Sequence, residues 1–171
     1  MNIIWIELFN LLKLKIQKSN SITLLVNGIS MLPLLHPHDR IGIKYMNEYN
    51  IGEIIVFIFD QSTILVHRIL DIKNDIYFCK GDNAFRLEAI QKSDILGKVI
   101  WRERNSVHLD LSEANICLAK DSLMIHRIFL SLSMDIERTK QTPEYKDYAD
   151  HYFSSGMDWL LDVSSRAKVQ E

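Results

Sequence analysis

Residues 53–70 read EIIVFIFDQSTILVHRIL, and this stretch determines the fold class. Two runs rich in β-branched residues flank the short polar link DQS, a pattern that is typical of two neighbouring strands. Runs of the same kind recur before and after it. Together they predict seven strands, with the sequences ITLLVN, RIGIKY, EIIVFIF, TILVHRIL, DIYFC, DILGKVIW and SVHLDL. Short strands joined by short links indicate a mainly β fold, either a coiled antiparallel sheet or a partly closed barrel.

The N-terminal end of the chain is expected to be helical. Residues 1–21 contain the apolar run IIWIELFNLLKLKIQK, which Glu7 and several lysines interrupt. A membrane span needs about 20 consecutive apolar residues, and the run also lacks the layout of a secretion signal. We therefore expect a retained amphipathic helix that packs on the core, with docking on a membrane surface as the alternative.

The sequence divides into three parts: an N-terminal helix at 1–21, a β core at 22–111 and a C-terminal helical appendage at 112–171. In the appendage, the apolar spacing predicts one helix over 112–136, and Thr142-Pro143 opens a second helix as its N-cap and first residue. The second helix carries an aromatic stripe that we expect to pack in a core, made by Tyr145, Tyr148, Tyr152 and Trp159.

The charge balance and the two cysteines exclude several classes of protein. The chain has 20 Lys and Arg residues against 22 Asp and Glu residues. It has no basic run and so lacks the positive patch of a nucleic-acid-binding protein, and no nucleic-acid partner is expected. Cys79 and Cys117 each lie in an apolar stretch, spaced neither as a metal knuckle nor as a redox pair. They are expected to be reduced core thiols of a cytoplasmic protein.

Three short patches are not required for strand formation: GISM at 28–31, LVHR at 65–68 and KGDNA at 80–84. A serine hydroxyl becomes a nucleophile only when a base lies within hydrogen-bond reach, usually with a third group that orients the base. The period of two in a strand turns His67 toward the apolar face of TILVHRIL and Arg68 toward the other face. His67 is then either the base of a nucleophile in a cleft or an ordinary buried histidine.

The order and spacing of these patches resemble the core of type I signal peptidases and related serine endopeptidases. That family presents a Ser-Met box, a Gly-Asp strand, a strand with the general base, a Lys-Gly-Asp-Asn box and an Ile-Leu-Gly-Lys-Val strand. The corresponding sequences here are GISMLPLL, GEIIVF, LVHRIL, KGDNA and ILGKVI, within residues 26–100. Most bacterial members use lysine as the base. His67-Arg68 resembles instead the histidine type of the endoplasmic reticulum and of some bacterial and archaeal relatives.

The resemblance implies a serine endopeptidase in which Ser30 is the nucleophile and His67 is the general base. Asp82 matches the aspartate of the Lys-Gly-Asp box. Glu88 stands six residues beyond Asp82, at the place where the histidine type has its acid. Both carboxylates are expected on the loop after DIYFC, and so the identity of the acid that orients His67 stays open.

The resemblance also assigns Gly28, Ser30 and Met31 to the oxyanion site and the substrate groove, with the Ser30 N–H as the oxyanion donor. Gly28 is expected to allow close approach of the substrate backbone, although many signal peptidases have a hydroxyl residue there as a second donor. Glu53 stands where the family has an aspartate. The motif HPHD at 36–39 contains potential metal ligands, but no matching ligand pair occurs elsewhere. Neither a metal nor a cofactor is expected.

No membrane anchor of the signal peptidase kind is expected, and so the substrate should be a cytoplasmic or peripherally bound peptide. It would bind in extended form along a strand edge. In its size and its terminal helices the chain resembles small relatives that accompany ribosomally made, modified peptides, and this resemblance makes leader removal the first hypothesis. One alternative is a catalytically decayed peptide-binding or scaffolding protein of the same fold. Another, a self-cleaving repressor, is disfavoured by the short segment before residue 22 and by histidine at the lysine position. The oligomeric state stays open.

Overall fold

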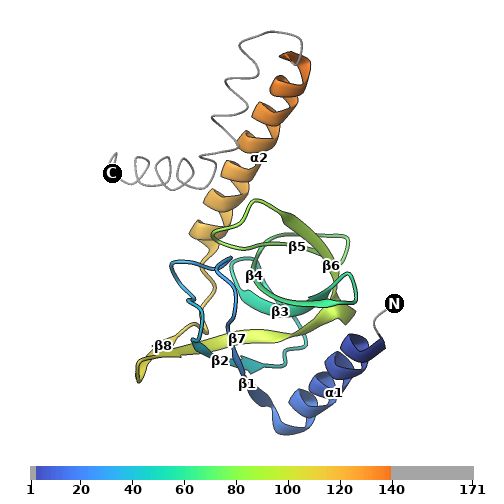
Figure 1. Ribbon diagram of the computed structural model, residues 1–171, viewed down its shortest axis with the longest axis vertical. Coiled ribbons are helices and arrows are strands. Elements are labelled where there is room, and N and C mark those ends of the chain that lie inside the picture. Colours follow the sequence, from blue (N-terminus) through green and yellow to red (C-terminus); the bar gives the residue numbers. More distant parts are fainter. Residues whose placement is uncertain (1–2, 140–171) are drawn as a thin grey trace. The chain divides into compact units, whose positions relative to one another are not determined.

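The computed structural model describes residues 3–139 and contains a curled antiparallel sheet of eight strands, preceded and followed in sequence by a helix (Figure 1). This confirms the mainly β fold with terminal helices. In chain order the elements are α1 (Ile3–Ser19), β1 (Ser21–Leu25), β2 (Arg40–Lys44), β3 (Ile54–Phe59), β4 (Thr63–Lys73), β5 (Ile76–Lys80), β6 (Leu87–Gln91), the 3₁₀ helix η1 (Lys92–Asp94), β7 (Ile95–Arg104), β8 (Val107–Asp110) and α2 (Ile116–Thr139).

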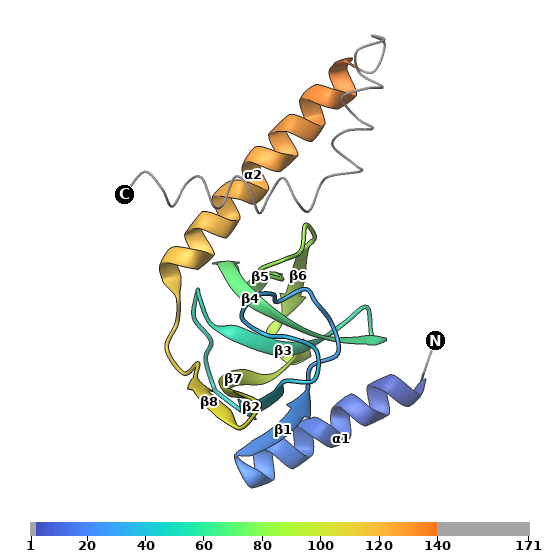
Figure 2. The same ribbon diagram turned by 60° about the vertical axis from the view of Figure 1, so that its left-hand side comes forward.

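The strands pair in the order β1-β2-β7-β3-β4-β5-β6, and β8 pairs with β7. Figures 1 and 2 show β3, β4, β5 and β6 bending around a common interior, which gives the sheet the form of a half-barrel. Register shifts in the β2–β7, β3–β7 and β4–β5 pairings accompany this bending. Such irregularities increase the local twist of a strand and allow a sheet to curl.

The seven predicted strands are present, but the prediction missed an eighth, β6. Its sequence LEAIQ contains Glu, Ala and Gln, which are poorly represented in strands or neutral there, so the segment gives a weak strand signal. It is a strand because β5 pairs with it residue by residue, from Ile76 opposite Gln91 to Lys80 opposite Leu87. β6 carries Glu88, which was expected on a loop.

β3 is buried on both faces, which explains its unbroken apolar sequence. Its residues Ile54, Val56 and Ile58 belong to one cluster of buried side chains, called here the first core cluster. Ile55 and Phe57 point to the opposite face and belong to the second core cluster. The second core cluster also contains Tyr49, Ile69, Tyr77, Cys79, Ile90 and Ile95.

The N-terminal helix α1 packs on the sheet, as predicted for an amphipathic helix at the core. Phe9 and Ile16 are buried in the first core cluster. Leu8, Leu11 and Leu14 lie on the exposed side of the helix. Within residues 3–139, no helix combines the length and the apolar character needed to cross a membrane.

The compact unit that contains the sheet comprises Met1–Met124, and so the first turns of α2 belong to it. A second unit begins at Ile125. The predicted helix over 112–136 is present as α2, which starts where the Asn115 side chain accepts the Leu118 N–H at 3.0 Å. The second predicted C-terminal helix and its aromatic stripe lie outside the described residues.

Candidate active site

Ser30 lies on the long connection between β1 and β2. The connection is closed at its base, where the Val26 N–H donates to the Asp39 carbonyl at 2.9 Å. After Ser30 the chain turns inward, and Met31 and Leu35 are buried in the first core cluster. These apolar anchors hold the segment against the sheet while Ser30 itself stays partly exposed.

His67 approaches Ser30 from β4. The pairing of β3 with β4 places His67 opposite Ile55, on the face of the second core cluster. Its ring also meets Phe57 edge to face, with the ring centroids 5.9 Å apart. His67 is only 3% exposed, and its Nε2 lies 3.1 Å from Ser30 Oγ. The packing therefore fixes the ring with one nitrogen directed at the hydroxyl.

Glu88 reaches the other ring nitrogen of His67 from β6. The pairings of β4 with β5 and of β5 with β6 place Ile69, Cys79 and Glu88 in one row across the sheet. His67 shares this face, because it precedes Ile69 by two residues. Glu88 Oε2 lies 2.9 Å from His67 Nδ1. Because a carboxylate can only accept a hydrogen bond, Nδ1 carries the proton, and Nε2 accepts from the hydroxyl of Ser30.

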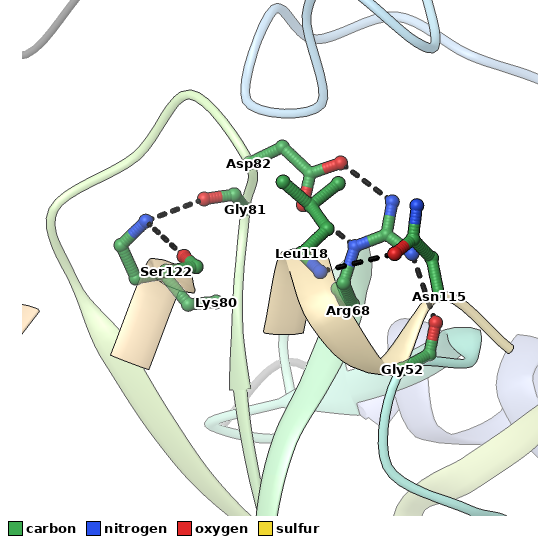
Figure 3. A network of polar contacts seen from close by, with 8 residues as sticks. All are labelled: Gly52, Arg68, Lys80, Gly81, Asp82, Asn115, Leu118 and Ser122. Carbon is green, nitrogen blue, oxygen red and sulfur yellow. Dashed lines mark hydrogen bonds and ion pairs between the residues drawn. The ribbon is translucent and has the colours of Figure 1, made fainter. Parts of the chain in front are cut away.

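Asp82, the other candidate acid, is bound by Arg68 (Figure 3). Arg68 Nε donates to Asp82 Oδ1 at 2.9 Å, and Arg68 Nη2 donates to Oδ2 at 2.8 Å. Arg68 follows His67 directly and so lies on the opposite face of β4. The structure thus brings Ser30, His67 and Glu88 together, whereas both oxygens of Asp82 are occupied by the guanidinium.

The loop between β5 and β6 holds the segment that carries Ser30 in place. The Asn83 N–H donates to the Ser30 carbonyl at 2.7 Å, and Asn83 Nδ2 donates to the Ile29 carbonyl at 3.2 Å. A Cβ atom added to Gly81 would lie 2.5 Å from the Ser30 carbonyl oxygen, so only glycine allows this approach. No role for Asn83 was predicted from the sequence, although its place in the KGDNA patch was a signal.

The two remaining residues assigned to the groove differ from expectation. Met31 is 2% exposed and packs in the first core cluster, so its side chain does not line a groove. Gly28 makes no close approach within the protein, because a Cβ atom added there would meet nothing within 4 Å. It leaves open space two residues before Ser30. Among the hydrogen bonds of residues 3–139, none uses the Ser30 N–H.

Glu53 and Asp39 each form an ion pair with a basic residue. Glu53 accepts from Lys98 at 2.6 Å, and both side chains are buried. Asp39 binds Arg104 through both carboxylate oxygens, at 2.7 and 2.8 Å, and also accepts the His36 N–H at 2.8 Å. Burial opposes ionisation of Asp39, but the hydrogen bonds from Arg104 and His36 outweigh it and lower the pKa.

The Asp39 carboxylate of the HPHD motif is therefore already paired. Throughout residues 3–139, no three side chains of His, Cys, Asp or Glu are arranged to hold a metal ion.

The cysteines are both free, but only one of them is a core residue. Cys79 is buried between Ile69 and Glu88 in the row across the sheet. Burial, with a contribution from the charge of Glu88, raises the pKa of the Cys79 thiol, so the thiol is no nucleophile at neutral pH. Cys117 is exposed on α2, contrary to the expectation of a core thiol.

One protein family matches the part of the chain that contains this site. A family model described as Peptidase S24-like matches residues 6–100, more than half of the chain. The matched range contains Ser30, His67 and Glu88, whereas α2 lies beyond it. Among curated proteins none matches the chain. The match supports the broad relationship of this chain to serine peptidases of the S24 and signal peptidase kind and does not single out the endoplasmic-reticulum type.

Proposed function

Because the chain belongs to the Peptidase S24-like family, we propose that it is a serine endopeptidase whose nucleophile is Ser30. The family as a whole supports serine peptidase activity. For this chain, the supporting observation is the row of hydrogen bonds from Ser30 Oγ to His67 Nε2 and from His67 Nδ1 to Glu88. In such a row, the base can take the hydroxyl proton while the carboxylate stabilises the resulting imidazolium.

The reaction follows from these positions. Ser30 Oγ attacks the carbonyl carbon of the scissile peptide bond, and its proton passes to His67 Nε2. The Ser30 N–H, which has no acceptor among residues 3–139, donates to the oxyanion of the tetrahedral intermediate. His67 then returns the proton to the leaving amine. A water molecule deprotonated by His67 hydrolyses the acyl-enzyme, which regenerates Ser30.

The substrate is proposed to be a peptide bound in extended form beside residues 25–30. Leu25 and Ile29 expose apolar side chains there, at 62% and 54%. Gly28 adds no side chain, and the open space beside it leaves room for another backbone. These features suit main-chain pairing with small apolar pockets. Among peptides, the leader of a ribosomally made, modified peptide is our first candidate, from the resemblance to small relatives noted above.

A peptide-binding protein without catalysis is the alternative function. It is favoured by Gly28, which offers no hydroxyl as a second oxyanion donor, so that oxyanion stabilisation depends on the Ser30 N–H. Loss of one such donor lowers turnover about 100-fold in well-studied serine peptidases. This predicts slow catalysis rather than none.

Labelling with a fluorophosphonate distinguishes the two functions, because the probe reacts only with an activated serine. We expect one adduct per chain at Ser30, measured by intact and peptide mass spectrometry. Ser30→Ala should remove the adduct and the cleavage of a candidate leader peptide. Ser62→Ala, at an exposed serine between β3 and β4, is the control that should keep both. EDTA should change neither. An unlabelled wild-type chain would contradict the peptidase and favour the binding protein.

A further inference from the structure

The face of β4 and β5 that points away from His67 carries a chain of polar contacts (Figure 3). Lys80, the last residue of β5, donates from Nζ to the Gly81 carbonyl at 3.1 Å and to Ser122 Oγ, also at 3.1 Å. Ser122 belongs to the second turn of α2. Lys80 is 6% exposed and Ser122 is 9% exposed. The two side chains form a buried link between the catalytic sheet and α2.

A second link lies beside the first. The Gly52 carbonyl accepts from Arg68 Nη1 at 2.8 Å and from the Asn115 N–H at 3.1 Å. Gly52 has a φ of 91°, and a Cβ atom there would lie 2.6 Å from the Asn115 carbonyl carbon. Asn115 is the residue that caps α2. α2 is thus attached to the sheet unit at two points: its capping residue Asn115 binds the Gly52 carbonyl, and Ser122 binds Lys80.

Gly81 is the point where these contacts meet the nucleophile. On one side its carbonyl accepts from Lys80. On the other its backbone lies against Ser30, closely enough to exclude any side chain. The next two residues continue the contact, since Asp82 is held by Arg68 and the Asn83 N–H donates to the Ser30 carbonyl. A displacement of Gly81 would therefore displace Ser30 relative to His67.

We propose that Ser122 is a positioning residue for the catalytic serine: through Lys80 it holds Gly81 against Ser30, so that α2 completes an active site whose reacting groups lie elsewhere. The residue lies outside the range matched by the family model. A buried ammonium that loses an acceptor either moves to find another or stays unsatisfied. When the ammonium moves toward another acceptor, its hydrogen bond to the Gly81 carbonyl weakens, and small errors in the position of a nucleophile lower the rate of attack. The inference rests on the proposed peptidase function.

The experiment compares Ser122→Ala, Ser122→Thr and Lys80→Met, with Ser62→Ala as the control. For fluorophosphonate labelling, we expect Ser122→Ala to lower the maximal rate of inactivation about fivefold, roughly the effect of one hydrogen bond, at unchanged probe affinity. Ser122→Thr, which keeps the hydroxyl, should restore the rate. Lys80→Met combined with Ser122→Ala should be no slower than Lys80→Met alone, because both substitutions break the same link.

Hydrogen exchange gives a readout that does not depend on catalysis. The Asn83 and Ala84 amides donate to Ser30 and Gly81, and both should exchange faster in Ser122→Ala than in the wild type or in Ser122→Thr. Wild-type exchange at these amides in Ser122→Ala would overturn the inference, as would equal slowing of inactivation by Ala and Thr. If the wild type is not labelled at all, the peptidase proposal fails, and the exchange of these two amides alone decides whether Ser122 positions Ser30.

Discussion

The two faces of β4 use similar groups for different purposes. His67 and Arg68 are neighbours in sequence, and each is paired with a buried carboxylate: Glu88 on one face and Asp82 on the other. The third partner differs. His67 also meets the hydroxyl of Ser30 at 3.1 Å, whereas Arg68 also donates to the carbonyl of Gly52 at 2.8 Å. One face ends at a potential nucleophile and the other at backbone.

This difference between the two faces of β4 explains why Glu88, and not Asp82, is hydrogen-bonded to His67. Arginine stays charged in proteins and binds a carboxylate through two parallel hydrogen bonds, so Asp82 has both oxygens engaged. Histidine, unlike arginine, can accept a hydrogen bond at one ring nitrogen, and Glu88 holds His67 in the tautomer that can accept from Ser30. The strand face, rather than the distance along the chain, therefore decides which carboxylate orients His67.

The largest effect is expected for the base itself. His67→Gln should lower the rate of peptide cleavage about 10⁵-fold, because among residues 3–139 no other side chain hydrogen-bonds to Ser30 Oγ. His67→Lys should not restore activity, since the ring contact with Phe57 and the hydrogen bond from Nδ1 to Glu88 both position an imidazole, and a lysine side chain can make neither. The measurement is single-turnover cleavage of a leader peptide, with thermal melts to confirm folding. Substantial activity in either variant would remove His67 from the mechanism.

Replacing each of the two carboxylates by its amide tests which of them orients His67. Glu88→Gln should lower kcat about 10³-fold with little change in KM, because the amide no longer holds the His67 tautomer or stabilises the imidazolium. Asp82→Asn should lower kcat far less. The two variants are compared by steady-state kinetics. A larger kinetic loss in Asp82→Asn than in Glu88→Gln would reverse the assignment of the two faces.

The free energy of unfolding should depend more on Asp82, whose substitution has the smaller effect on kcat. Asp82→Asn leaves the buried Arg68 guanidinium without its counter-ion, which should cost about 3 kcal/mol of the free energy of unfolding. Exposed Asp60 gives a matched control, Asp60→Asn, which should change that free energy by less than about 0.5 kcal/mol. Urea denaturation measures both. If Asp82→Asn is as stable as the control, the Arg68–Asp82 pair is not a structural element of the site.

Most of the fold follows from local sequence, because seven strands are rich in β-branched residues and are separated by turns. β6 does not, since Glu88 and its neighbours become a strand only through pairing with β5. Because β6 was not predicted, the sequence did not show which face of the sheet Glu88 lies on. The choice between Asp82 and Glu88 as the acid that orients His67 therefore stayed open. The order of the family patches predicts Ser30 and His67 as nucleophile and base, and their side chains lie 3.1 Å apart in the structure.

Contacts between segments distant in sequence determine the positions of several side chains that local sequence patterns do not predict. The resemblance assigns Met31 to the groove, but the turn after Ser30 directs its side chain into the first core cluster. The link between Lys80 and Ser122 joins residues 42 positions apart in sequence, and no local pattern relates them. Such contacts depend on the docking of α2, which periodicity predicts as a helix but does not place.

The smallest effect concerns the protonation of Lys80, on the same face as Arg68. Burial lowers the pKa of Lys80, and the charges of Asp82 and Glu88 only partly oppose this. In the unfolded chain the lysine returns to about 10.4. Between the two pKa values the unfolded state binds more protons, and so this lysine makes the protein more stable as the pH rises toward about 10.4.

Lys80→Met removes that contribution, whereas the contributions of Tyr49, Tyr77 and Cys79 are present in both proteins and cancel. The free energy of unfolding of the wild type, minus that of Lys80→Met, should therefore increase with pH in the alkaline range. Urea denaturation at a series of pH values measures it. A difference that stays constant or falls would mean that Lys80 keeps an ordinary pKa despite its burial.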